Sequence, residues 1–187
     1  SSQDKNYSYI PSTCSFSANP AYVHYTSNNT IFGTQWAHLP TVPAGADLIC
    51  DASSDIFSGP IDVAKHALIY AGAQKNMGPS GVTLVIVRRD LLGHALPVTP
   101  SAFNYEMQAN NDSMYNTPPV FAVYVALETL KWVKQQGGLD AMQKRNDEKA
   151  QKLYAEIDAN PLFKGTAAKE DRSRMNVTFV MEKPELE

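Results

Sequence analysis

The chain has 187 residues, with 16 Lys and Arg against 19 Asp and Glu and a formal net charge of −3. A charge this close to balance gives no electrostatic reason to expect binding to nucleic acid or to an anionic membrane. No apolar run approaches the roughly 20 residues that a membrane-spanning helix needs.

The N-terminal residues show no apolar secretory core. The two cysteines, Cys14 and Cys50, form no CxxC pair and no disulfide framework. We therefore expect a cytoplasmic protein with two free thiols. The four histidines lack the spacing of metal ligands, so we expect no metal site.

Four short apolar runs predict strands in the first half of the chain. They cover residues 21–26, 47–51, 67–70 and 82–87. The first two end in polar turn clusters at 27–30 and 51–55. The last two lie on either side of a glycine-rich turn, and their continuous apolar composition is typical of buried strands.

The second half of the chain predicts helices. After a proline-rich stretch at 93–119, apolar residues recur at helical spacing from 120 to 130. Thr117 is the expected N-cap of this helix and Pro118 lies in its expected first turn. The two glycines at 137–138 end the helix, and a second helix is expected from about 139 to 159. Residues 174–180 predict a final strand.

This succession of strands and then long helices predicts an α/β fold. Charged residues become denser after position 138, so we place a domain boundary near 136–138. The expected units are residues 1–136 and residues 137–187.

Lys75 lies in the glycine-rich turn between the third and fourth predicted strands. A tight turn between buried strands would hold its amine near the protein interior. Burial disfavours the ammonium form, and a neutral amine can attack a carbonyl group. Lys75 is therefore a candidate Schiff-base lysine, and the alternative is a solvated lysine in a turn.

Polar side chains also follow the first two predicted strands, at Thr30 and Asp51, and Gln74 directly precedes Lys75. Ligands of open α/β sheets gather where strands end. A hydroxyl, a carboxylate and an amine suit pyridoxal 5'-phosphate, because a carboxylate can keep the ring nitrogen protonated while an amine bonds the cofactor. Taken singly, Thr30 is consistent with ordinary turn chemistry and Asp51 with a cap. Gln74 could donate to a phosphate or could hold the turn.

Asn116 and Thr117 lie directly before two prolines at the start of the first predicted helix. Backbone amides and a hydroxyl at a helix N-terminus form an anion site that suits a phosphate. The alternative for these two residues is a simple N-cap.

Five stretches together resemble the phosphoserine aminotransferases, a family of fold-type I pyridoxal-phosphate enzymes in the class V aminotransferase group. They are residues 26–36, 50–58, 69–81, 111–119 and 173–179. The most specific are the Ala-Gly-Ala-Gln-Lys-Asn turn around Lys75 and the Asn-Thr-Pro-Pro segment that begins at Asn116. The resemblance implies that residues 1–136 form the second half of a large cofactor-binding domain with a mixed sheet. Residues 137–187 would then begin a small C-terminal domain.

The resemblance also implies roles for the candidate residues. Lys75 matches the lysine that bonds the cofactor and moves the substrate proton, and Asp51 matches the carboxylate on the pyridinium nitrogen. Thr30 matches the hydroxyl near the cofactor phenolate oxygen, and Gln74 matches a phosphate ligand. Two residues match positions that reach the cofactor phosphate of the other subunit in the family's homodimer: Asn116 and Thr117.

The reaction implied by the resemblance is reversible transfer of an amino group from glutamate to 3-phosphohydroxypyruvate, giving O-phosphoserine and 2-oxoglutarate in serine biosynthesis. Family members are about twice as long as this chain. Their glycine/serine phosphate loop, ring-stacking aromatic residue and substrate-binding His and Arg residues are absent from this sequence. We therefore expect the chain alone to be inactive, and a second chain carrying the missing N-terminal half to restore the site.

Two other interpretations stay open. Class V enzymes of the alanine–glyoxylate aminotransferase and cysteine desulfurase types also place an Asp before a Lys at similar separation. The Asn-Thr-Pro-Pro segment and the Gln-Lys-Asn turn favour the phosphoserine type. A non-catalytic remnant that binds a partner through an exposed sheet edge would differ from all of these in not binding the cofactor.

Overall fold

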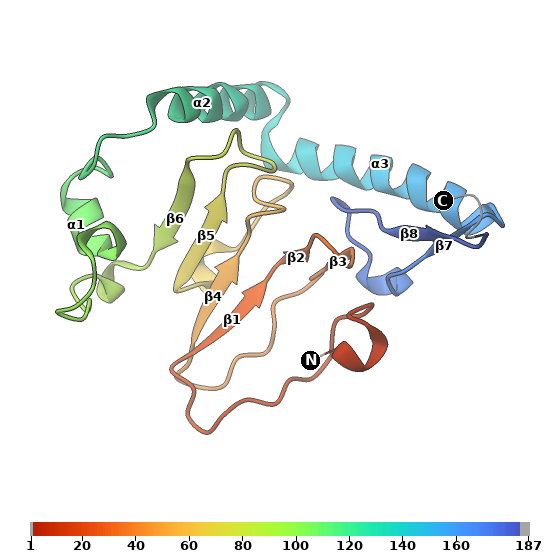
Figure 1. Ribbon diagram of the computed structural model, residues 1–187, viewed down its shortest axis with the longest axis horizontal. Helices are drawn as coiled ribbons and strands as arrows, with labels where there is room; N and C mark the ends of the chain where they lie inside the picture. The colour runs from red at the N-terminus through yellow and green to blue at the C-terminus, as the bar shows by residue number, and fades with distance from the viewer. Residues whose placement is uncertain (1, 184–187) are drawn as a thin grey trace.

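The computed structural model describes residues 2–183. Its centre is a four-stranded sheet with the strand order β1-β4-β5-β6 (Figure 1). The strands are β1 (Tyr22–Thr26), β4 (Asp47–Asp51), β5 (Leu68–Gly72) and β6 (Thr83–Val87). β1, β4 and β5 run parallel, and β6 runs antiparallel to β5. The predicted α/β class, the mixed sheet and the four strands are confirmed.

The register of the parallel strands brings their ends to one edge of the sheet. Thr26 pairs with Asp51, and Asp51 pairs in turn with Tyr70. Parallel neighbours present their carboxyl ends at the same edge. The segments that follow the three strands therefore leave the sheet side by side.

One face of this sheet forms the hydrophobic core. Side chains alternate between the two faces along a strand, and those that point to one face are buried: Val23, Tyr25, Leu48, Cys50, Ile69 and Ala71. On the other face Tyr22 is 58% exposed. The predicted burial of the two strands that flank Lys75 is confirmed for one face of β5, where Ile69 and Ala71 are buried. It is wrong for β6, in which no residue is buried.

Two short hairpins lie beside the sheet. One pairs β2 (Asn28–Asn29) with β3 (Thr34–Gln35), and the other pairs β7 (Phe163–Gly165) with β8 (Phe179–Met181). The first hairpin is joined to the C-terminal part of the chain by a hydrogen bond of 2.8 Å from Ser173 N to Gly33 O.

The final strand is shorter than predicted. Only Phe179–Met181 pairs as β8, so the strand predicted over 174–180 is wrong along most of its length. The Ser173 hydroxyl accepts hydrogen bonds from the amides of Met175 (3.0 Å) and Asn176 (2.9 Å). These bonds turn the chain where an extended strand was expected.

Three α-helices accompany the sheet: α1 (Tyr105–Asn110), α2 (Val120–Gln135) and α3 (Gly138–Ala159). The two long helices are confirmed, and Figure 1 shows α2 lying beyond the end of β5, with α3 running on from it toward β7 and β8. Gly137 separates them with a left-handed φ of 101°. α1 was not predicted, and the Asn104 side chain caps its first turn. Single-turn 3-10 helices cover Gln3–Lys5, Val63–Lys65, Arg89–Leu91, Ser101–Phe103 and Lys169–Asp171.

The start of α2 differs from the prediction. Pro119 occupies the N-cap position and no side chain caps the helix, so Thr117 is not its N-cap. The residue before a proline is disfavoured from the helical conformation. Pro118 is such a residue, and the helix therefore begins only after the second proline.

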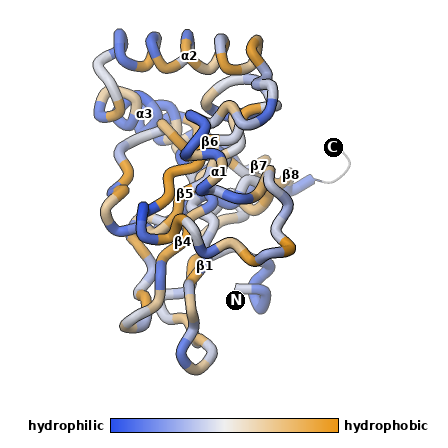
Figure 2. The backbone as a smooth tube through the Cα atoms, turned by 90° about the vertical axis from the view of Figure 1, so that its left-hand side faces the viewer, coloured by the Kyte–Doolittle hydropathy of each residue, from blue (hydrophilic) through white to orange (hydrophobic). Residues whose placement is uncertain are grey.

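α2 packs against the rest of the fold with a different side from the one that its apolar periodicity predicts. Its buried residues are Ala122 and Ala126, and Gly78 lies so close that a Cβ there would be 3.3 Å from the Ala126 Cα. The apolar residues of the predicted stripe are all exposed: Val120, Val123, Tyr124, Leu127 and Leu130. Figure 2 shows α2 along one end of the molecule, with hydrophobic residues recurring along it.

Within the described residues, no helix combines the length and the apolar character that crossing a bilayer requires. The same residues contain no group of three or more His, Cys, Asp or Glu side chains that could hold a metal ion. Cys14 is exposed and Cys50 is buried, and both are free thiols.

Candidate cofactor site

Lys75 and Thr30 meet at the carboxyl edge of the parallel strands. Lys75 Nζ donates a hydrogen bond of 2.6 Å to Thr30 Oγ1. The turn that carries Lys75 is closed by hydrogen bonds from Gly78 N to Ala73 O (2.8 Å) and from Ala73 N to Val82 O (2.9 Å). The Lys75 side chain is exposed, so the expected burial of its amine is wrong in this structure. The turn, rather than burial, fixes where the amine lies.

Asp51 ends β4 at the same edge and is half-buried. Its Oδ1 accepts a hydrogen bond of 2.9 Å from Ser53 N, and the Ser53 hydroxyl accepts one of 3.1 Å from Gly72 N. These two bonds tie the end of β4 to the end of β5, two residues before Gln74. Burial, together with the nearby Asp51 carboxylate, raises the pKa of Tyr70 on β5.

Gln74 is exposed, and its side-chain amide folds back over the Gly72 backbone, where a Cβ on Gly72 would overlap it. A residue with a side chain at position 72 would therefore displace Gln74. The amide remains accessible beside Lys75.

Asn116 and Thr117 are exposed in the segment that leads into α2. Among residues 2–183, no hydrogen bond joins either of them to Thr30, Asp51 or Lys75. The structure therefore brings together three predicted site residues, with Gln74 adjacent, and leaves the Asn116–Thr117 pair outside this group.

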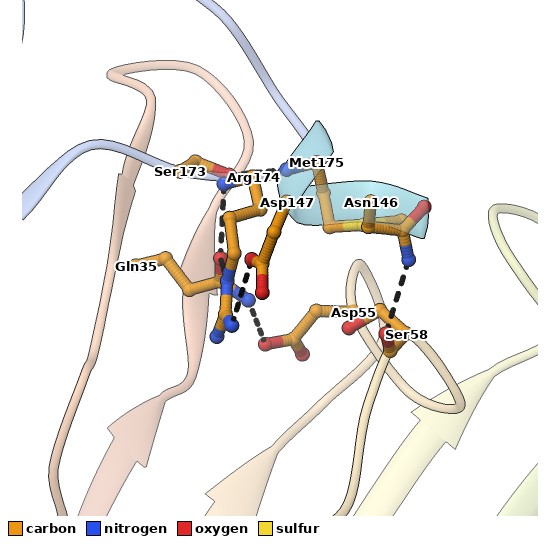
Figure 3. Close-up of polar contacts among 8 residues, drawn as sticks. All are labelled: Gln35, Asp55, Ser58, Asn146, Asp147, Ser173, Arg174 and Met175. Atoms are coloured by element: carbon orange, nitrogen blue, oxygen red, sulfur yellow. Dashed lines mark hydrogen bonds and ion pairs between the residues drawn. The ribbon is translucent and has the colours of Figure 1, made fainter. Parts of the chain in front are cut away.

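A second polar cluster, which the sequence did not predict, consists of Gln35, Asp55, Asp147 and Arg174. Figure 3 shows Gln35 between Asp55 and Arg174, with Asp147 beside the guanidinium group. Burial raises the pKa of the Asp55 carboxyl, while hydrogen bonds from Ser27 and Gln35 act to lower it. The only sequence signal for this cluster was that Asp55 shares a polar turn with Asp51. Gln35 and Arg174 are 139 positions apart, so periodicity could not connect them.

The cluster borders a cavity of about 280 Å³ lined mainly by residues 35–39 and 55–62. Its lining includes Ser27, Gln35, Asp55, Gln143 and Arg174. Lys75 is not among the lining residues, so this cavity is separate from the edge where the amine lies.

The comparison with known families identifies residues 3–186 as matching Aminotransferase class-V. The chain is 56% identical to a phosphoserine aminotransferase of Parabacteroides distasonis, over 97% of this chain and 50% of that protein. It is 51% identical to a phosphoserine aminotransferase of Geobacillus kaustophilus, over 100% of this chain and 52% of that protein. The chain thus spans about half the length of the curated relatives it matches.

Solved structures of phosphoserine aminotransferases are also similar to this chain. A phosphoserine aminotransferase studied for radiation damage of its Schiff base superposes with a TM-score of 0.93 at 46% identity, covering 98% of this chain and 52% of that one. A phosphoserine aminotransferase from Trichomonas vaginalis, described as bound to PLP, has a TM-score of 0.85 at 43% identity over 91% of this chain and 50% of that one. An alanine–glyoxylate aminotransferase from Nostoc is similar in fold alone, at 17% identity and a TM-score of 0.68 over 88% of this chain and 47% of that one.

Proposed function

The chain belongs to the class V aminotransferase family, and from that premise we propose that it is the cofactor-bearing part of a phosphoserine aminotransferase. The reaction would transfer an amino group from glutamate to 3-phosphohydroxypyruvate, with O-phosphoserine and 2-oxoglutarate as products. Identities of 51–56% to relatives that carry this name support the proposal. The observation that carries it is the meeting of Lys75 Nζ with Thr30 Oγ1 at the strand edge where Asp51 ends.

The residues at this edge fit pyridoxal phosphate. An accessible amine, a hydroxyl within 2.6 Å of it and a half-buried carboxylate on the neighbouring strand provide the donor set that the cofactor needs. When bound, this cofactor serves as an electron sink for bonds at the substrate α-carbon. We assign Lys75 to covalent attachment of the cofactor, Asp51 to its ring nitrogen and Thr30 to its phenolate oxygen.

The remaining assignments concern the cofactor phosphate and the substrate proton. We assign Gln74 to the phosphate of the same subunit, because its amide is accessible beside Lys75. Asn116 and Thr117 would reach the phosphate bound by the second subunit of a homodimer, and their exposure is consistent with contacts outside this chain. Lys75 Nζ would carry the proton to and from the substrate carbon, as a positioned amine does in general acid–base catalysis.

The organisation of the whole enzyme is also a proposal. We infer that residues 1–136 belong to a large cofactor domain and residues 137–187 to a small C-terminal domain. Because the chain spans about half of its relatives, we expect the substrate-binding groups to be supplied by further sequence, in the same polypeptide or in a second chain. The 187-residue chain alone is then expected to hold the cofactor without catalysing transamination. Free thiols at Cys14 and Cys50 support a reducing, cytoplasmic location.

Reductive labelling tests this proposal. The chain is incubated with pyridoxal phosphate, reduced with borohydride and digested, and the peptide that contains Lys75 is examined by mass spectrometry for a phosphopyridoxyl group. We expect the label on Lys75, and its loss in Lys75→Ala. Lys65, which is exposed and remote from the strand edge, serves as the internal control for nonspecific reaction. Equal labelling of Lys65 and Lys75 would contradict the proposal.

A further inference from the structure

A line of hydrogen bonds connects the C-terminal part of the chain to Gln35 on β3. The Gln35 side-chain oxygen accepts from Arg174 N (3.0 Å) and from Arg174 Nε (3.3 Å), and its Nε2 donates to Asp55 Oδ2 (3.0 Å) (Figure 3). Arg174 offers only donors to Gln35, and a carboxylate offers only acceptors. The orientation of the Gln35 amide is therefore fixed, and its side chain is only 6% exposed.

The line continues from Asp55 to Asp51. The Ser27 hydroxyl lies within hydrogen-bond distance of both Asp55 Oδ1 and Asp51 O, the latter at 3.1 Å. Ser27 N also donates to Asp51 O, at 2.9 Å. The Ser27 hydroxyl has one proton for these two acceptors and shares it between Asp55 and Asp51 O, whereas Ser27 N holds Asp51 O by a bond of its own. The Asp51 carboxylate is held by Ser53 N. Fixing the carbonyl restricts the main chain from which the Asp51 carboxylate projects.

The far end of the line is anchored to α3. Arg174 Nη1 donates to Asp147 Oδ1 at 3.3 Å, and the buried Asn146 donates from Nδ2 to Ser58 O at 3.0 Å. Ser58 belongs to the turn that begins at Asp51 and contains Phe57, whose φ is +62°. A bulky residue rarely adopts this left-handed conformation, so the turn requires support from its surroundings. α3 gives that support directly through the bond from Asn146 to Ser58, while Asp147 holds Arg174 at the other end of the line.

We propose that Arg174, Gln35, Asp55 and Ser27 form a positioning relay, through which the C-terminal part of the chain sets the direction of the Asp51 carboxylate. The proposal rests on the proposed function in one respect, namely that Asp51 faces the cofactor ring. None of the four residues needs to touch the cofactor. Gln35, Asp55 and Arg174 are positioning residues that act through Ser27 and Asp51.

Two variants test the relay: Gln35→Glu alone, and Gln35→Glu combined with Asp55→Asn. The double variant exchanges the amide and the carboxylate and keeps the net charge of the wild type. In Gln35→Glu, a carboxylate oxygen replaces Nε2 at 3.0 Å from Asp55 Oδ2, so two acceptors face each other and like charges repel. In the double variant Gln35→Glu with Asp55→Asn, the amide now at position 55 can donate to the carboxylate now at position 35, while the amide oxygen still accepts from Ser27. The Arg174 amide keeps an acceptor in both variants. The double variant is therefore expected to restore what Gln35→Glu disrupts.

Amide hydrogen exchange, followed by NMR in the 187-residue chain without added cofactor, gives the first readout. The informative amides are those of Ser27 and Ser53, which donate to the Asp51 main chain and side chain. We expect Gln35→Glu to accelerate their exchange about tenfold or more, since it leaves buried polar groups unpaired, and the double variant to return it toward the wild-type rate. Tyr154→Phe is the matched control, because it removes the bond of 2.9 Å to Ser173 O beside Arg174 but lies outside the relay.

Binding of pyridoxal phosphate, followed by fluorescence titration, gives the second readout. We expect the dissociation constant to rise about tenfold in Gln35→Glu, to recover in the double variant and to stay unchanged in Tyr154→Phe. Unchanged exchange at Ser27 and Ser53 in Gln35→Glu, or acceleration of the same size in Tyr154→Phe, would overturn the relay.

The two readouts separate failure of the relay from failure of the proposed function. Faster exchange at Ser27 and Ser53 in Gln35→Glu, with the same dissociation constant for pyridoxal phosphate as wild type, would show that the relay does not affect cofactor binding. That result would overturn the relay as a positioning device and would not contradict the proposed function. If the wild-type chain binds no pyridoxal phosphate, the proposed function fails. The exchange measurement then still decides whether the relay holds Asp51.

Discussion

Lys75 and Thr30 are 45 positions apart in the sequence, and Lys75 Nζ donates a hydrogen bond of 2.6 Å to Thr30 Oγ1. The contact exists because β1 and β5 run parallel on either side of β4, so the segments that follow them leave the sheet together. The amine is thus oriented by a hydroxyl in a position that is open to solvent. A ligand that bonds the amine would find the hydroxyl within reach of its own polar groups.

Replacing Thr30 tests this arrangement. Thr30→Val keeps the shape of the side chain but removes the hydroxyl, which would donate to the phenolate oxygen, and we expect pyridoxal phosphate to bind about fivefold to tenfold more weakly, as the loss of one hydrogen bond predicts. Thr30→Ser keeps the hydroxyl and should bind nearly as well as wild type. Fluorescence titration measures both variants. If serine proved as damaging as valine, packing of the methyl group rather than the hydrogen bond would be the important feature.

The four strands of the central sheet could be predicted from the sequence because each is a short apolar run bounded by turn residues. The short strands β2, β3 and β7 are too brief and polar to give such a signal. The direction in which α2 faces could not be predicted either. Its apolar stripe includes Tyr124 and Leu127, yet its buried side carries Ala122 and Ala126 and lies against the turn that contains Gly78. α2 approaches the backbone at Gly78 so closely that only small residues fit between them. The periodicity of apolar residues marks the large apolar side of a helix, and it does not show whether that side is buried or exposed.

Two substitutions on neighbouring residues of α2 check this orientation. Ala126→Leu inserts a large side chain against Gly78 and should lower the free energy of unfolding by about 1–3 kcal/mol. Leu127→Gln changes a side chain that is 47% exposed and should alter it by no more than about 0.5 kcal/mol. Urea denaturation gives both values. The reverse ranking would mean that the predicted stripe, and not the alanine side, packs against the rest of the fold.

In the candidate site, too, some residues could be predicted from the sequence and others could not. Lys75, Thr30, Asp51 and Gln74 follow strand ends, so the α/β architecture places them at one edge and sequence reasoning finds them. Arg174 reaches Gln35 across 139 positions and through no repeating pattern. Contacts of this kind depend on how the C-terminal segment folds back, which local propensities do not determine.

Gly33 lies at the end of the turn that carries Thr30, and its environment predicts a severe effect of substitution. Its φ is +70°, and a Cβ there would overlap the Thr178 side chain and lie 3.0 Å from Asn176 O. Gly45 has a φ of +83° with nothing within 4 Å, so it is a matched control for backbone strain alone. We expect Gly45→Ala to cost about 1–2 kcal/mol of stability, and Gly33→Ala to cost about 1–3 kcal/mol more. Equal losses in thermal or urea unfolding would show that the close contact with Thr178 relaxes freely.

Asp158 is expected to make the C-terminal part of the fold sensitive to acid. Hydrogen bonds from Arg172, at 2.7 and 2.9 Å, and then the ion pair with Lys169, at 3.0 Å, hold the pKa of the Asp158 carboxyl well below its usual range. A carboxyl with a lowered folded-state pKa contributes stability above its unfolded value, near 4, and loses that contribution as the pH falls through the folded value.

The difference in unfolding free energy between wild type and Asp158→Asn should therefore be constant from pH 7 to about 5 and shrink below about pH 4. Urea denaturation at a series of pH values measures it. Glu148→Gln on the exposed side of α3 is the control, since no ion pair involves Glu148 in residues 2–183, and its difference from wild type should depend less on pH. A difference for Asp158→Asn that stayed constant down to pH 2 would mean that the contacts with Arg172 and Lys169 do not depend on the charge of the carboxylate. The Arg172 side chain is only 10% exposed and lies over the Tyr154 ring at 4.5 Å, so its packing could then account for the whole contribution.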